Sequence, residues 1–141
     1  MHSINKPILL IESDPLDTNN IRCALEEMGV KSPCVHSNNS EEALTYLNNQ
    51  INVKPWLILF GLDSKNLDGL NYLKIIKTDD NLKKIPVVII AESYEDNRIA
   101  QCFELGAAGY IVKPQDSSKI TDTIGTIMNY WNLSELPPTG I

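Results

Sequence analysis

Charged side chains follow three of the short apolar runs in this chain. Glu12 and Asp14 come after the first run, Asp63 after the third, and Lys113 after the last. Carboxylates can hold a divalent cation or act as nucleophiles, and a fixed ammonium can stabilise charge that develops on a phosphoryl group. These residue types are the ones that phosphoryl chemistry needs, provided that the fold brings the ends of the apolar runs together.

Apolar runs and amphipathic segments alternate along the chain, which is the pattern of an α/β fold. Strands are predicted at residues 7–11, 33–37, 56–60, 86–90 and 110–112. Helices are predicted at residues 15–28, from the cap Ser40 through Leu47, around Leu70 to Lys77, and at residues 96–105 and 117–131. Asp14 before Pro15 is a typical helix cap with proline at the first helical position. Gly29 and Gly106 are predicted to end their helices.

Right-handed crossovers with helices on both faces favour a doubly wound sheet. We therefore predict a five-stranded parallel sheet of the flavodoxin-like (βα)5 type, with strand order 2-1-3-4-5. Sites in such sheets lie outside the carboxyl ends of the strands. The ends of strands one, three, four and five hold Glu12, Gly61, Ala91 and Lys113.

The loop after the third strand ends in Asp68-Gly69, and the last strand is followed by Lys113-Pro114. With Glu12, these motifs resemble the receiver domain of two-component response regulators over roughly residues 6 to 131. In that family the aspartate that accepts phosphate lies at a strand end, seven residues before the Asp-Gly pair. Counting back from Asp68 leads to Gly61, which has no side chain.

The resemblance implies that the phosphorylation site is degenerate at three positions. Gly61 stands at the acceptor position, Ser13 at one position of the acidic pair that holds magnesium, and Ala91 at the position of a serine or threonine. Glu12 is the retained member of the acidic pair. We therefore expect no phosphorylation at residue 61.

Three further positions retain the family's residues or groups. Lys113 is the lysine after the last strand, Tyr110 is the aromatic that changes rotamer as the switch flips, and Asp63 falls where a backbone carbonyl helps to hold the metal. Glu12 and Asp63 remain weak metal candidates, so the chain is expected to use no cofactor beyond weakly held Mg²⁺. The family also holds the peptide bond of the Lys113-Pro114 pair cis.

Alternatives stay open at several of these residues. Asp14 is either a helix cap or a second metal ligand, and the cap is favoured by Pro15. Asp63 could be a displaced nucleophile, but it lies two residues past the predicted strand end, roughly 6–7 Å from the attacking position. Lys113 could pair with Glu12 or Asp63 without any phosphate. His2 and His36 have no convergent ligands and are expected to be structural or exposed.

Composition excludes other classes of protein. The 141 residues suffice for one domain with its own core. Eighteen acidic and twelve basic residues give a net charge of −6 without a basic cluster, so nucleic acid is not an expected partner. Cys23, Cys34 and Cys102 lack metal-ligand spacing and suggest buried free thiols in a reducing cytosol. No apolar run approaches the ~18 residues of a membrane span, so a cytoplasmic protein without membrane contacts is expected.

The predicted organisation is a single receiver-like domain at residues 1–131 with a tail at residues 132–141. We expect a stand-alone signalling protein that is not an enzyme and acts by contact with a histidine kinase, a downstream effector or a second copy of itself. Tyr110, Tyr130 and Trp131 are the candidate partner-binding residues, although Trp131 could instead close the domain's own core. A regulator phosphorylated on Asp63 and a small-molecule binder are the alternative functions.

Overall fold

The structure is a computed structural model, and it describes residues 6–63, 68–92 and 95–133. Five parallel strands form one sheet in the order β2-β1-β3-β4-β5, which confirms the predicted doubly wound fold. The strands are β1 (Ile8–Ile11), β2 (Cys34–Ser37), β3 (Leu57–Leu62), β4 (Val87–Ala91) and β5 (Gly109–Val112). The helices are α1 (Pro15–Glu27), α2 (Ser40–Asn48), α3 (Gly69–Thr78), α4 (Asp96–Glu104) and α5 (Ile120–Leu133), with a 3₁₀ turn, η1 (Ser117–Lys119), before α5.

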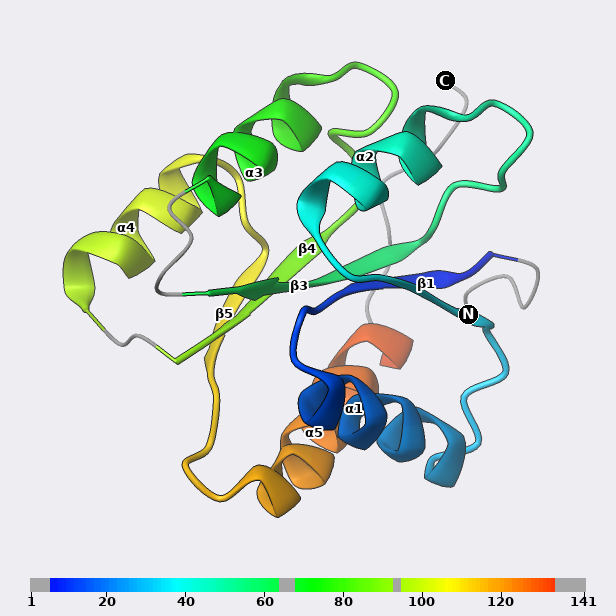
Figure 1. Cartoon of the computed structure of the whole chain (residues 1–141), viewed down its shortest axis with the longest axis vertical. Helices are drawn as coiled ribbons and strands as arrows, with labels where there is room; N and C mark the ends of the chain where they lie inside the picture. Colours follow the sequence, from blue (N-terminus) through cyan, green and yellow to red (C-terminus); the bar gives the residue numbers. More distant parts are fainter. Residues whose placement is uncertain (1–5, 64–67, 93–94, 134–141) are drawn as a thin grey trace.

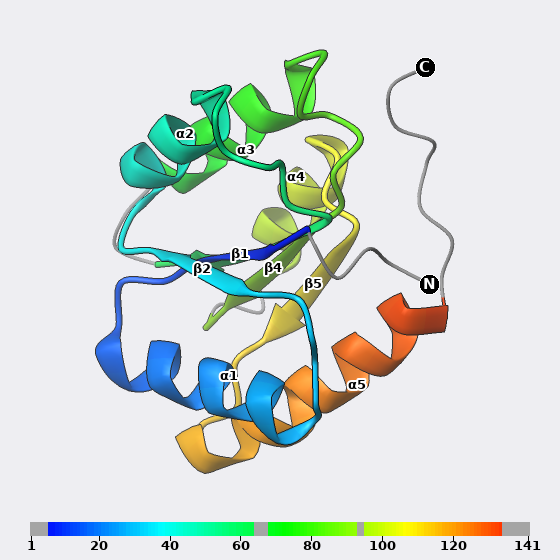
Figure 2. The ribbon, with the colours of Figure 1, turned by 90° about the vertical axis from the view of Figure 1, so that its right-hand side faces the viewer.

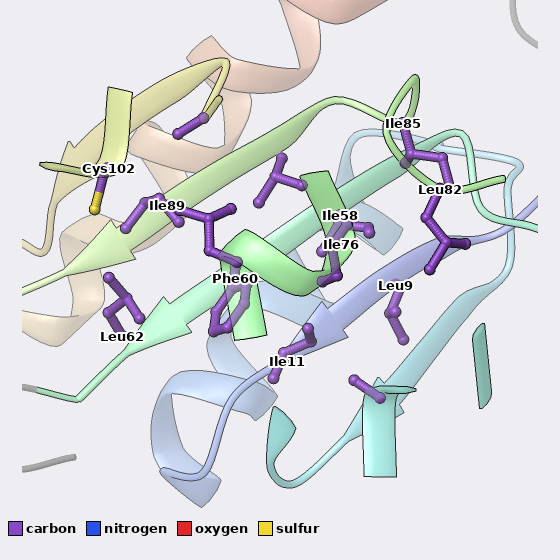
Figure 3. Close-up of a cluster of buried hydrophobic side chains, with 14 of the residues drawn as sticks. Leu9, Ile11, Ile58, Phe60, Leu62, Ile76, Leu82, Ile85, Ile89 and Cys102 are labelled. Atoms are coloured by element: carbon purple, nitrogen blue, oxygen red, sulfur yellow. The ribbon is translucent and has the colours of Figure 1, made fainter. Parts of the chain in front are cut away.

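The helices cover the sheet on both faces. Helices α2, α3 and α4 lie on one face, and α1 and α5 lie side by side on the other (Figures 1 and 2). The central strands are therefore buried on both faces, which explains why their sequences are nearly continuous apolar runs. Alternate residues of β1 and β3 enter opposite cores: Leu9, Ile11, Ile58 and Phe60 pack under α2 to α4 (Figure 3), and their neighbours pack against α1 and α5.

Local hydrogen bonds explain where the first two helices begin. The Asp14 side chain accepts from the backbone N–H groups of Leu16 and Asp17, as expected of a helix cap. The predicted cap of α2 was wrong by one residue, because the Asn39 side chain accepts from the Glu42 N–H at 2.8 Å and Ser40 is already helical. Gly29 has φ +70° and follows α1, which confirms the predicted stop.

Strand β3 and helix α5 both end later than predicted. Strand β3 continues beyond Phe60, because Gly61 and Leu62 still pair with Ile90 and Ala91 of β4. Helix α5 reaches Leu133, past the predicted domain boundary at residue 131.

The three cysteines do not share one environment. Cys102 is buried and Cys34 is half-buried, but Cys23 is exposed, so the expectation of three buried thiols was wrong. The buried stripe of α1 consists of Thr18, Ile21, Ala24 and Leu25, and Cys23 lies outside it. Within the described residues, no helix is long and apolar enough to cross a membrane.

Candidate functional site

Glu12 directly follows β1 and is held by the strand and by the start of α1. Its backbone N–H donates to the carbonyl of Ser37 at 3.1 Å, which continues the pairing of β1 with β2. Its Oε2 atom accepts from the backbone N–H of Asp14 at 3.1 Å. Only 5 % of the side chain is exposed. The carboxylate is therefore fixed inside the end of the sheet rather than presented to solvent.

Lys113 approaches Glu12 from the end of β5. Its backbone N–H donates to the carbonyl of Ala91 at 2.7 Å, so the chain stays beside β4 after the strand ends. The Nζ atom lies 2.9 Å from Glu12 Oε1 and 3.0 Å from Asp17 Oδ2. Burial by itself would lower the pKa of Lys113, but the hydrogen bonds and charges of Glu12 and Asp17 outweigh it, and the pKa is raised.

This geometry confirms one predicted partner of Lys113 and replaces the other. The pair with Glu12 was expected, whereas Asp17 takes the place that was suggested for Asp63. Asp17 lies in the first turn of α1, where a carboxylate is favoured by the helix dipole. That position alone carried no signal that the side chain would turn toward the end of β5.

Gly61 lies within β3, and its missing side chain is explained by Glu12. Among the described residues, only Gly29 and Gly106 have a positive φ, so the backbone of Gly61 would accept other residues. A Cβ atom on Gly61 would lie 2.6 Å from Glu12 Oε1 and 2.9 Å from the carbonyl oxygen of Ile11. Contacts this short require a shift of the neighbours. The carboxylate of Glu12 thus fills the space where a side chain at residue 61 would begin.

The other predicted site residues differ in their exposure and in their contacts. Ser13 is exposed, and Ala91 is buried at the end of β4. Asp14 is engaged as the cap of α1. Asp63 is exposed and directly follows β3, so its predicted place two residues past the strand end was wrong because the strand is longer.

His36 supports the site from the neighbouring strand. Its Nε2 atom lies 2.8 Å from the backbone oxygen of Glu12 and 3.4 Å from Thr18 Oγ1. The Thr18 hydroxyl in turn donates to the carbonyl of Asp14 at 2.8 Å. His36 therefore has the structural role that was expected, and it ties β2 to the segment that carries Glu12. His2 lies outside the described residues.

The candidate partner-binding residues fall into two groups. Tyr110 is half-buried and packs against the core under α2 to α4. Trp131 packs partly against the opposite core, while the neighbouring Tyr130 is 62 % exposed. The two rings of α5 meet edge to face, with centroids 5.1 Å apart. Trp131 thus contributes to the domain's own packing, and Tyr130 points outward.

The fold and the position of the site lead to a family. Residues 8–125 match the family described as the response regulator receiver domain. The chain belongs to this family. The response regulator Rcp1 of Synechocystis sp. is 25 % identical over 130 residues, which is 89 % of this chain and 88 % of Rcp1. The probable methanogenesis regulatory protein FilR2 of Methanothrix harundinacea is 27 % identical and covers 88 % of this chain and 82 % of its own length.

Solved receiver structures are also similar. The phosphorylated cyanobacterial phytochrome response regulator RcpA superposes with a TM-score of 0.86 at 31 % identity, covering 95 % of this chain and 99 % of RcpA. The Mn²⁺-bound form of Rcp1 has the same TM-score at 25 % identity and covers 94 % of this chain and 99 % of Rcp1. The chain therefore matches nearly the full length of both regulators.

Two features expected from the family are not found here. The described residues contain no cis peptide bond, so the Lys113-Pro114 bond is trans. The described residues also contain no group of three or more His, Cys, Asp or Glu side chains that could hold a metal ion. Glu12 is paired with Lys113, Asp14 caps a helix, and Ser13 offers only a hydroxyl. The residues present do not fit the divalent cation of a receiver site.

Proposed function

We propose that this chain is a pseudo-receiver, a stand-alone receiver-like signalling protein that acts in a two-component-type pathway without being phosphorylated. One observation carries the proposal: the Glu12 carboxylate occupies the space at Gly61 where an acceptor side chain would begin. The site lacks both the nucleophile and the room for one.

Asp63 is a poor substitute for the absent nucleophile. In a parallel strand each residue adds about 3.3 Å, and displacement chemistry is sensitive to misplacement by about 1 Å. The ammonium of Lys113, which would have to stabilise the phosphoryl charge, is already shared between Glu12 and Asp17. An attacking group at Asp63 would therefore have neither the position nor the electrostatic support that the transfer needs.

The output is a contact with another protein rather than a reaction. Three large apolar side chains are exposed on neighbouring elements: Phe103 on α4 (49 %), Val112 on β5 (40 %) and Tyr130 on α5 (62 %). Together with Tyr110 and Trp131 they are the candidate contact residues for a signalling partner, because aromatic residues often anchor such contacts. The partner is a histidine kinase, a downstream effector or a second copy of the chain in the cytoplasm.

Intact-mass spectrometry after incubation with acetyl phosphate and Mg²⁺ tests the proposal. We expect no addition of one phosphoryl group to the wild-type chain, with an intact receiver domain labelled in parallel as the positive control. Asp63→Asn and Glu12→Gln identify the acceptor if labelling occurs. A phosphoryl adduct that disappears in Asp63→Asn would replace the proposal with a phosphorylated regulator that uses a displaced carboxylate.

A further inference from the structure

The ammonium of Lys113 lies where two carboxylates from different elements converge. Glu12 follows β1 and Asp17 belongs to α1, yet both place an oxygen within 3.0 Å of the same nitrogen. The three side chains are well enclosed, with exposures of 11 % for Lys113, 5 % for Glu12 and 14 % for Asp17. Two enclosed carboxylates around one point are a favourable position for a cation, and here that cation is the ammonium of Lys113.

We infer that Lys113 is a built-in cation that neutralises this pocket and excludes divalent metal ions from it. The inference rests on the proposed pseudo-receiver function, because it explains what occupies the site in place of a metal. Mg²⁺ prefers oxygen ligands in near-octahedral order and is often held by one or two carboxylates plus waters. Glu12 and Asp17 supply that number of carboxylates, but the ammonium between them repels a dication.

Removal of the charge should therefore uncover a metal site that the wild-type chain does not have. Lys113→Met keeps an unbranched apolar stem of similar length, with sulfur in place of one methylene, and removes the ammonium. Glu12 and Asp17 then face each other without a compensating charge, and a cation between them would offset their mutual repulsion. A divalent ion with its own waters satisfies both carboxylates at neutral pH.

The probe is Mn²⁺ added to the full-length chain. Binding is measured as the decrease of the paramagnetic resonance signal of the free ion. We expect no saturable site in the wild type and one site in Lys113→Met, with a Kd at least about tenfold lower than any wild-type value. Adding Asp17→Asn or Glu12→Gln to Lys113→Met should weaken the new site. Lys74→Met, a change of an exposed lysine in the middle of α3, is the matched control and should bind like the wild type.

Stability measurements provide a second readout. Because a ligand that binds only the folded state raises the melting temperature, Mn²⁺ should stabilise Lys113→Met against heat and leave the wild type unchanged. Lys113→Gln, which also removes the charge, replaces Lys113→Met in both measurements if the methionine variant does not fold.

Equal Mn²⁺ affinity in wild type and Lys113→Met, or affinity that is insensitive to Asp17→Asn and Glu12→Gln, would overturn the inference. Saturable Mn²⁺ binding by the wild-type chain would overturn it without any variant. Phosphorylation of the wild-type chain would instead refute the proposed function and leave the metal titration to be judged by itself.

Discussion

Gly61→Ala tests whether Glu12 has taken the space of the absent acceptor. The new Cβ atom would meet Glu12 Oε1 at 2.6 Å, Glu12 Cδ at 3.1 Å and the carbonyl oxygen of Ile11 at 2.9 Å. The carboxylate can move only by loosening its contacts with Lys113 and the Asp14 N–H. The Ile11 oxygen belongs to the backbone of the central strand β1 and cannot move independently. We therefore expect Gly61→Ala to destabilise the fold.

Two opposing effects determine the size of the change. Replacement of glycine by alanine at an unstrained position stabilises by about 0.4–1 kcal/mol through the unfolded chain. Overpacking of a tight site costs about 1–3 kcal/mol, and the disturbed ion pair adds to that cost because it is buried. We expect a net loss of about 1–3 kcal/mol. At about 2–4 °C per kcal/mol, the melting temperature should fall by roughly 2–12 °C.

Glu12→Ala and Glu12→Gln separate the steric cause from the electrostatic one. Both remove the charge that pairs with Lys113, but only alanine removes the atoms that meet the new Cβ. In a double-mutant cycle measured by thermal or urea unfolding, Gly61→Ala should cost least beside Glu12→Ala, whereas beside Glu12→Gln it should lose only the ion-pair part of its cost and keep the steric part. The contact with the Ile11 oxygen leaves some cost in every background. The reasoning is refuted if Gly61→Ala is as stable as the wild type, or if its cost is the same in all three backgrounds.

The remaining predictions concern repair of the site, the last helix and the cysteines. Gly61→Asp alone should be labelled poorly by acetyl phosphate and Mg²⁺. The triple variant with Ser13→Asp and Ala91→Thr should be labelled far faster, because these groups act on one transition state. Equal labelling of the two variants would show that the metal site was never impaired. Trp131→Ala should lower the melting temperature by several degrees, because the ring packs partly on the core, whereas Tyr130→Ala should leave it nearly unchanged and weaken association in sedimentation or partner capture; the opposite pattern would make Trp131 the interface anchor. At pH 8, Cys23 should react with a thiol reagent long before Cys102 and Cys34, because it is exposed. Desolvation raises the pKa of the other two thiols, although Arg98 beside Cys102 and Arg22 beside Cys34 act to lower it. A fast phase of the reaction that persists in Cys23→Ser would contradict this.

The order of the elements could be predicted because the central strands are buried on both faces and appear as separate apolar runs. Features that depend on where a single side chain points could not be predicted from the sequence. Cys23 lies one position from the buried Ala24, and only the packing of α1 on the sheet decides which of them turns inward. Asn39 and Ser40 are both good caps, and the geometry of the chain leaving β2 selects Asn39.

The site shows the same division between pattern and packing. The glycine at residue 61, where the receiver pattern predicts the acceptor aspartate, could be located by counting residues back from Asp68. The ion pair of Asp17 with Lys113 could not be predicted, because it depends on how close the first turn of α1 comes to the end of β5. The length of β3 was also hidden, since Gly61 and Leu62 resemble the start of a loop but remain paired with β4.

The departures from the receiver pattern support one another physically. A lysine enclosed at the end of β5 needs a compensating carboxylate, and without an aspartate at residue 61 it finds Glu12 and Asp17. Once Glu12 has turned toward Lys113, it fills the space beside Gly61, and a larger residue there meets both the carboxylate and the β1 backbone. An aspartate at 61 would also add a third negative charge around a single ammonium, which is costly in an enclosed site. The glycine and the ion pairs therefore form one arrangement, and we expect that reversing any one of them alone leaves the site a poor acceptor of phosphate.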